Sequence, residues 1–406
     1  MWFESSVRWR ARLTHRALRA TWQHASAWED GWLRRHLVEN SRSLFGLAHR
    51  FEQLSSSIDF QRAVPVRSMD HHRHSTAELR RGLLRGLTVR PPSCLAVSEE
   101  AEVPLTAGSR HAGAQLWRLW ASGVEDAHPG ALAGSLAVVP ETLSGGQSLR
   151  TRALPVVAGE FAIPWVPCWR NAVPARVAAV RDATLRGFLT ARFALARDVT
   201  LLSARTAADL VALGRLIQEH GASLVRAIHD GTLGVFAFEQ PRLCARLIRG
   251  LHPDPSRARA LGRAMERAGG LRPVDAWPRL KALAVRSGGP RAVLWPWYGD
   301  RPVVEAGLFV GPERVGLPLG GRGGLCALTS PGLLEFLSRN GGAPLRQHQL
   351  RDGETYQVVV TTPGGLYRVA TDLWVRVAGQ REGAVLVEPG EEPAPARRCA
   401  PPHLAS

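Results

Sequence analysis

The middle of the chain alternates short apolar runs with amphipathic segments. Thr206 and Asp209 have the spacing of a capping box, and Leu210, Leu213 and Ile217 then share one helical face. The same period repeats at Leu224, Val225 and Ile228, until Gly231 ends the helix as a C-cap. Apolar strands separate such helices between about 136 and 240, so we predict an α/β fold with mostly parallel sheets.

The pattern changes to β-hairpins near the carboxyl end. Val, Tyr and Thr dominate residues 356–362, which we predict to be a strand, and Pro363-Gly364-Gly365 then forms a tight turn. A second strand follows from Leu366, so we expect Tyr367 to line a pocket with Arg368 beside it. The glycine-rich run 320–324, between two apolar strands, is predicted to be a hairpin turn rather than a phosphate loop.

The amino-terminal residues 7–40 are predicted to be helical. Arginines alternate there with Trp9 and Trp22, a pattern compatible with an anionic membrane surface, although a solvated basic face on a packed helix fits the apolar positions better. His71, His72 and His74 are predicted to lie in a polar loop without metal, because no carboxylate or thiol stands at ligand spacing.

Composition narrows the possible functions. The net charge of +17 suggests nucleic-acid binding. However, lysine occurs only once and the arginines are dispersed along the chain, which is typical of high-GC, bacterial codon usage. We therefore expect no specific nucleic-acid binding. The sequence has no run of eighteen apolar residues and no signal-peptide pattern, and its five scattered cysteines suit reduced thiols. These features predict a cytoplasmic protein without a membrane span.

Several motifs resemble the Gretchen Hagen family, the auxin-responsive promoter family of acyl acid–amido synthetases in the adenylate-forming superfamily. The hairpin signature is Val358 to Arg368 followed by Val375-Arg376-Val377-Ala378-Gly379, and further matches are Val64-Pro65-Val66 and Trp277-Pro278-Arg279-Leu280-Lys281. The resemblance implies two layered β/α subdomains with a smaller β-rich unit at about 303–379. It also implies ATP- and Mg²⁺-dependent adenylation of a carboxylic acid, followed by transfer to an amine.

The motifs that bind nucleotide in that family are altered. Where the resemblance implies a Ser-Gly-Thr-Thr-Gly phosphate loop, this chain has Ser98-Glu99-Glu100-Ala101-Glu102, which replaces glycines and hydroxyls with three acids. The family's acid beside an aromatic residue corresponds to Glu313, one residue displaced, near Phe309, and Asp372 falls on the glycine of the family's Gly-Asp pair. The predicted remnants of the nucleotide site are Ser98, Phe309, Glu313, Tyr367, Arg368 and Asp372.

The domain organisation predicted on this basis has an amino-terminal helical segment at 1–40 and an adenylate-forming-like large domain at 41–379. Residues 380–406 are predicted to be a disordered tail, without the family's small carboxyl-terminal domain. We predict a pseudoenzyme: a diverged family member impaired in ATP-dependent adenylation that binds a small carboxylic acid or a protein partner. The alternative is an active acyl-adenylate-forming ligase, perhaps completed in trans, that uses ATP and Mg²⁺.

Overall fold

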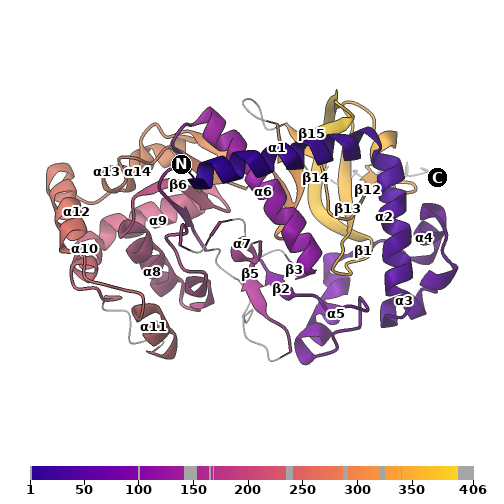
Figure 1. The fold of residues 1–406 in the computed structure, drawn as a ribbon, viewed down its shortest axis with the longest axis horizontal. Coiled ribbons are helices and arrows are strands. Elements are labelled where there is room, and N and C mark those ends of the chain that lie inside the picture. The colour runs from indigo at the N-terminus through magenta and orange to yellow at the C-terminus, as the bar shows by residue number, and fades with distance from the viewer. Residues whose placement is uncertain are drawn as a thin grey trace, which may run out of the picture.

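The computed structural model describes residues 2–98, 101–140, 153–163, 166–167, 169–234, 241–286, 291–319, 325–339 and 341–391. Three sheets build the fold, and the helices gather mainly around one of them (Figure 1). The helices after residue 183 lie at one end of the molecule, while the late strands form the other end (Figure 1).

A four-stranded parallel sheet forms the helix-rich end. Its strands run in the order β4, β6, β7, β8, and each neighbouring pair is parallel. Helices from 183 to 298 share one apolar core with the sheet, so the strands are buried and nearly continuously apolar. The predicted capping box Thr206–Asp209 is present at the start of α9, and Gly231 follows α10 with a φ of 67°. The strands are β4 (Ser135–Val138), β6 (Val199–Ala204), β7 (Ala282–Val285) and β8 (Val303–Glu305), and the helices are α8 (Ala183–Leu195), α9 (Ala207–Glu219), α10 (Gly221–His229), α11 (Pro241–Ile248), α12 (Pro255–Ala268), α13 (Pro273–Ala276) and α14 (Trp295–Tyr298).

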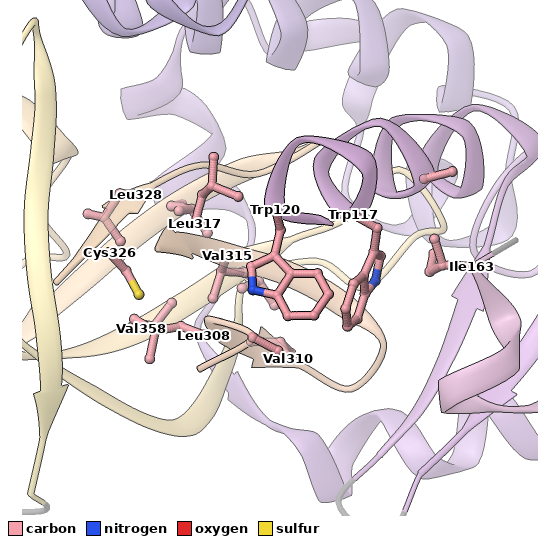
Figure 2. Close-up of a cluster of buried hydrophobic side chains, with 14 of the residues drawn as sticks. Trp117, Trp120, Ile163, Leu308, Val310, Val315, Leu317, Cys326, Leu328 and Val358 are labelled. Atoms are coloured by element: carbon pink, nitrogen blue, oxygen red, sulfur yellow. The ribbon is translucent and has the colours of Figure 1, made fainter. Parts of the chain in front are cut away.

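A three-stranded sheet lies between the two ends of the molecule. β2 (Cys94–Val97) pairs antiparallel with β3 (Glu102–Leu105) and parallel with β5 (Val156–Ala158). The long helix α6 (Ala107–Ala127) follows β3, and the short helix α7 (Gly159–Ala162) follows β5. Trp117 and Trp120 of α6 project towards the strands that carry Val310 and Val315 and belong to the largest apolar core (Figure 2).

The β-rich unit is a largely antiparallel sheet whose path is β12, β13, β14, β15, β11, β10, β9, with β1 joined in parallel to β14. The pair Pro318 and Cys326 closes a β10–β11 hairpin around the glycine-rich run, which confirms its two predicted strands, although 320–324 lie outside the described residues. The strands are β1 (Arg67–Ser68), β9 (Leu308–Val310), β10 (Glu313–Pro318), β11 (Cys326–Leu328), β12 (Leu333–Ser338), β13 (Thr355–Thr361), β14 (Val369–Arg381) and β15 (Ala384–Gly390).

The predicted tail from residue 380 is wrong for its first part. β14 continues to Arg381, and β15 pairs with β14 on one side and with β11 on the other. Val385 and Val387 of β15 are buried in the main core. Residues 380–391 therefore belong to the β-rich unit, because two neighbouring strands satisfy their backbone groups. Residues 392–406 lie outside the described part of the chain.

The amino-terminal helices pack on the rest of the fold. α1 (Trp2–Gln23) lies along α6, where Val7 is buried, and α2 (Ala25–Asn40) starts after a break at His24. His71, His72 and His74 belong to α5 (Met69–Arg81) rather than to the predicted loop. The described helices include none that is both long enough and apolar enough to span a membrane. The other short helices are α3 (Leu44–Ala48) and α4 (Ser57–Ala63).

Candidate functional site

The carboxyl ends of the parallel strands meet a small cavity of about 10 Å³, which is the size of one water molecule. In open α/β sheets, ligands bind at this edge. β4 contributes Val138, β6 contributes Ser203 and Ala204, and Arg286 stands directly after β7. The full lining is Trp117, Val138, Glu160, Ser203, Ala204 and Arg286.

Three segments that are distant in sequence meet beside this edge. They are the β2–β3 turn at Ser98, the start of α7 at Gly159, and the turn at Gly311 between β9 and β10. A Cβ atom added to Gly159 would lie 3.6 Å from the Cβ of Ser98, and one added to Gly311 would lie 2.8 Å from Cγ2 of Val103. The chains approach so closely because both positions are glycine.

The Ser98 side chain forms its hydrogen bonds within its own turn. Its Oγ lies 3.1 Å from both the amide nitrogen and the carbonyl oxygen of Ala101, and its own N–H donates to that carbonyl at 2.9 Å. The side chain is buried, with 2% exposure. The hydroxyl therefore closes a compact hairpin instead of pointing into open space, as a phosphate donor would.

The structure describes only one of the three acids of this turn, Glu102. Glu99 and Glu100 lie outside the described residues. Glu102 begins β3 and forms a two-point ion pair with Arg80 of α5, with N–O distances of 2.7 and 3.1 Å. The prediction that three acids place unpaired negative charge at this loop is therefore wrong for Glu102, because the guanidinium of Arg80 balances its charge.

Two arginines flank the ring of Phe309. The guanidinium carbon of Arg286 lies 4.6 Å from the ring centroid, and that of Arg314 lies 4.9 Å away. Arg286 also donates to the carbonyl oxygen of Gly311 at 3.1 Å. The ring centroids of Trp117 and Phe309 lie 5.7 Å apart, and the guanidinium carbon of Arg314 lies 4.5 Å from the centroid of the Trp117 ring. Cation–π contacts thus hold two positive charges beside the aromatic rings of Phe309 and Trp117.

Arg314 is an unusual buried cation that sequence reasoning missed. It is 1% exposed, and its Nε and Nη2 atoms have no hydrogen-bond partner in the described part of the chain. Burial lowers the pKa of Arg314 to about 9; the Cys326 thiol opposes this shift, and the nearby charge of Arg286 adds to it. A buried guanidinium with free donors favours an anion, preferably a planar carboxylate. Its only sequence signal was an arginine inside an apolar strand.

Glu313 does not have the properties of a metal-binding acid here. Its side chain is 5% exposed, Oε1 has no hydrogen-bond partner among the described residues, and burial raises the pKa of Glu313 to about 8. The carboxyl is therefore neutral at pH 7, whereas Mg²⁺ needs ionised oxygen ligands. The described residues contain no cluster of three acids, histidines or cysteines able to hold a metal ion. The residues that the structure describes here therefore do not fit the Mg²⁺ that an adenylating enzyme uses.

The structure corrects the predicted pocket position of Tyr367. Tyr367 is 1% exposed, stacks on Phe45 at 4.4 Å and donates to the carbonyl oxygen of Leu87 at 3.0 Å. It is thus part of a packed aromatic core that also contains Phe51 and Phe60. The Pro363-Gly364-Gly365 turn docks this core against β3, since a Cβ on Gly364 would lie 1.7 Å from the carbonyl oxygen of Pro104.

Arg368 is buried as well and contacts protein groups on all sides. It donates to both carboxylate oxygens of Glu335, at 2.9 and 3.1 Å, and to the carbonyl oxygens of Gln61 and Val64. Asp372 lies on the exposed side of β14. None of Tyr367, Arg368 and Asp372 lines the small cavity, and neither do Ser98, Phe309 and Glu313. Ser98 does lie close to the β9–β10 turn, since a Cβ added to Gly311 would be 3.9 Å from its Oγ.

The two layered subdomains, the β-rich unit and a site at the sheet edge define the fold of the large domain of adenylate-forming enzymes. The model of the GH3 family N-terminal domain matches residues 14–298. This chain belongs to the GH3 family, which confirms the resemblance found in its motifs.

Two solved structures show the same fold. GH3.15 acyl acid amido synthetase matches with a TM-score of 0.71 at 18% identity, over 92% of this chain and 70% of that chain. AtGH3.15 acyl acid amido synthetase in complex with 2,4-DB matches with a TM-score of 0.74 at 17% identity, over 93% and 70%. No curated protein sequence gives a significant match.

Proposed function

We propose that this chain is a diverged GH3-family protein that binds a small carboxylic acid and is impaired in ATP-dependent adenylation. The observation that supports acid binding is the pair Arg286 and Arg314 around Phe309 at the carboxyl edge of the parallel sheet. The guanidinium groups match a carboxylate, and the aromatic wall suits an apolar acid body. The relative in complex with 2,4-DB is consistent with that ligand class.

The impairment in adenylation is supported by the same region. The Ser98 hydroxyl is hydrogen-bonded within its turn, and the pKa of Glu313, at about 8, leaves that acid neutral. A nucleotide would need phosphate donors and an ionised metal ligand at these two positions. The alternative function, an active ligase, requires both groups to reorganise when ATP binds.

Acid binding is tested by isothermal titration calorimetry with 2,4-DB and benzoate as probes. Arg286→Ala removes the partly buried guanidinium and should weaken binding about tenfold to a hundredfold, since hydrogen bonds to charged groups contribute roughly 1.5–3 kcal/mol. The matched control is Arg291→Ala, at an exposed arginine in the next turn of chain, which should leave the Kd unchanged. Equal binding by both variants, or capture of a protein partner without any acid binding, would refute the proposed site.

The impairment is tested by titration with ATP–Mg²⁺ and by ATP–pyrophosphate exchange in the presence of the same acids. We expect neither binding at millimolar nucleotide nor exchange above the background without protein. Robust exchange by the purified chain would overturn the impairment and establish the ligase. That result would leave the acid site intact, so the two parts of the proposal can fail separately.

A further inference from the structure

A second and far larger cavity, of about 640 Å³, is lined on α6 by His111, Ala112, Gln115 and Leu116 and not by Trp117 or Trp120. It is bounded by α1 and the start of α2, by the first half of α6, and by the segment 328–332 (Figure 1). Its volume falls within the range of small-molecule sites. Along α1 the lining extends from Trp9 to Trp22, which corresponds to a length of roughly 20 Å, and after the break at His24 it continues onto the start of α2.

The wall of this groove is apolar and firmly held. Trp22 donates its indole N–H to the carbonyl oxygen of Leu328 at 3.0 Å, which fixes α1 against the β-rich unit. Trp9 and Leu13 stay 62% and 47% exposed at one end. Exposed apolar side chains that line a concavity are typical of a binding surface. The apolar part of the lining is Trp9, Leu13, Ala17, Leu18, Trp22, Ala25, Trp28, Leu116, Leu328 and Pro331.

Polar side chains in the wall of the groove form hydrogen bonds with one another. Thr14 Oγ1 contacts the side-chain oxygen of Gln115 at 2.9 Å, and the amide nitrogen of Gln115 lies 3.0 Å from Nε2 of His111. This row joins α1 to α6 across the floor. Because these groups already have partners, the middle of the groove favours an alkyl chain over a polar ligand.

A cationic pair lies at the Trp9 end. The contact Thr14–Gln115 and the ion pair Arg8–Asp126 show that α1 and α6 are antiparallel, which places Arg10 opposite Arg118. Arg10 lines the groove, whereas Arg118 neighbours Arg10 without being one of the lining residues. Neither arginine forms an ion pair with a described residue. Burial, and to a smaller extent the charge of Arg10, lowers the pKa of Arg118. Two facing guanidinium groups without a carboxylate favour an anion between them.

We infer that this groove binds a long-chain carboxylate, with its head group between Arg10 and Arg118 and its alkyl chain along the wall towards Trp22 and Trp28. The groove supplies an elongated apolar wall, while the arginine pair supplies charge at one end only. A single amphiphilic anion matches both features. A membrane surface matches them less well, because the wall is a concave groove between helices rather than a protruding apolar face.

The test is calorimetric titration with octanoate, dodecanoate and dodecanol, below their micelle-forming concentrations. Affinity should rise about two- to fourfold for each added methylene between octanoate and dodecanoate. Dodecanol, which lacks the charge, should bind at least about tenfold more weakly than dodecanoate. Equal affinity for octanoate and dodecanoate would contradict the apolar groove.

Matched variants locate the site. Ala17→Trp fills the groove from an exposed position and should abolish dodecanoate binding, whereas Ala20→Trp, exposed but outside the lining, should not. Arg10→Ala should weaken binding about tenfold, and Arg12→Ala should leave it unchanged. Arg286→Ala should also leave it unchanged, which separates this groove from the proposed acid site.

Two further outcomes would overturn the inference. One is sedimentation of the chain with phosphatidylcholine–phosphatidylserine vesicles without any binding of free dodecanoate, which would assign the groove to a membrane. The other is a dimer that Ala17→Trp dissociates and dodecanoate leaves intact, as measured by light scattering.

Discussion

Arg368 donates hydrogen bonds to both carboxylate oxygens of Glu335, and both side chains are almost fully buried, at 3% and 1% exposure. The backbone of Arg368 adopts a φ of 49°, which is uncommon for a residue other than glycine. The buried guanidinium also donates hydrogen bonds to the carbonyl oxygens of Gln61 and Val64. A residue of the family's signature motif therefore has a structural role in this chain.

The first prediction concerns that ion pair. Arg368→Ala leaves the Glu335 carboxylate buried without its cation, so we expect a loss of about 3–5 kcal/mol in the free energy of unfolding. The control is Arg376→Ala, which removes a partly exposed ion pair with Glu388 and should cost less than about 1 kcal/mol. Urea denaturation measures both, and similar losses in the two variants would contradict the buried-pair account.

The second prediction concerns Glu313 and alkaline pH. Burial raises the pKa of Glu313 from 4.5 to about 8, so the folded state holds a proton that the unfolded state has already released between these values. Stability should therefore fall as pH rises from about 4.5 to 8, by roughly 4 kcal/mol from this group alone.

Glu313→Gln tests this sign. The variant should exceed the parent protein in melting temperature at pH 8.5 and lose that advantage at pH 5. The exposed Glu354→Gln is the matched control and should show no such pH dependence. A parallel offset of Glu313→Gln at both pH values would mean that the carboxyl is ionised in the folded protein.

The third prediction concerns acid. Burial lowers the pKa of both His36 and His72 from 6.5 to about 4, so the unfolded state takes up protons first as pH falls. Each histidine should therefore lower the free energy of unfolding by roughly 3 kcal/mol as the pH falls from 6.5 to 4.

Substitution separates the two histidines from other acid effects. His36→Gln loses the stacking on Trp32 at every pH, so the informative quantity is the slope of stability against pH, which should become shallower. His74→Gln, at a largely exposed residue of the same helix as His72, should leave the slope unchanged. An unaltered slope in both His36→Gln and His72→Gln would refute the assignment.

The fourth prediction concerns the Pro363-Gly364-Gly365 turn. Gly364→Ala would place a Cβ 1.7 Å from the carbonyl oxygen of Pro104, and Gly365 has a φ of 96° that valine resists. Gly364→Ala and Gly365→Val should each destabilise the protein by more than about 2 kcal/mol. Gly262→Ala, in open space on α12, should be neutral or stabilising by up to about 1 kcal/mol, as measured by thermal unfolding.

The sequence by itself determined the features that depend on neighbouring residues. The capping box of Thr206 and Asp209, the C-cap at Gly231 and the hairpin turn at Gly364 are local, because their hydrogen bonds or dihedral angles involve residues within one or two turns. The alternation of strands and helices likewise gave the α/β class and the family. It did not give the end of the β-rich unit, since β15 is held by pairing with β11, which lies almost sixty residues away in the sequence.

Only the tertiary structure decided where the functional side chains point. Tyr367 is fixed by the carbonyl oxygen of Leu87 and Arg368 by Glu335, so a turn that looked suited to a ligand instead closes a core. Arg314 meets Phe309 as its cross-strand partner in the β9–β10 hairpin, which is a local contact. Arg286 follows β7 and reaches the same ring only because the parallel sheet and the β-rich unit pack against each other. The groove beside α1 likewise exists only because α6 and the segment 328–332 lie against it. Side-chain direction and burial come from such long-range packing, which outweighs local propensity when a charged group must find its partner inside the protein.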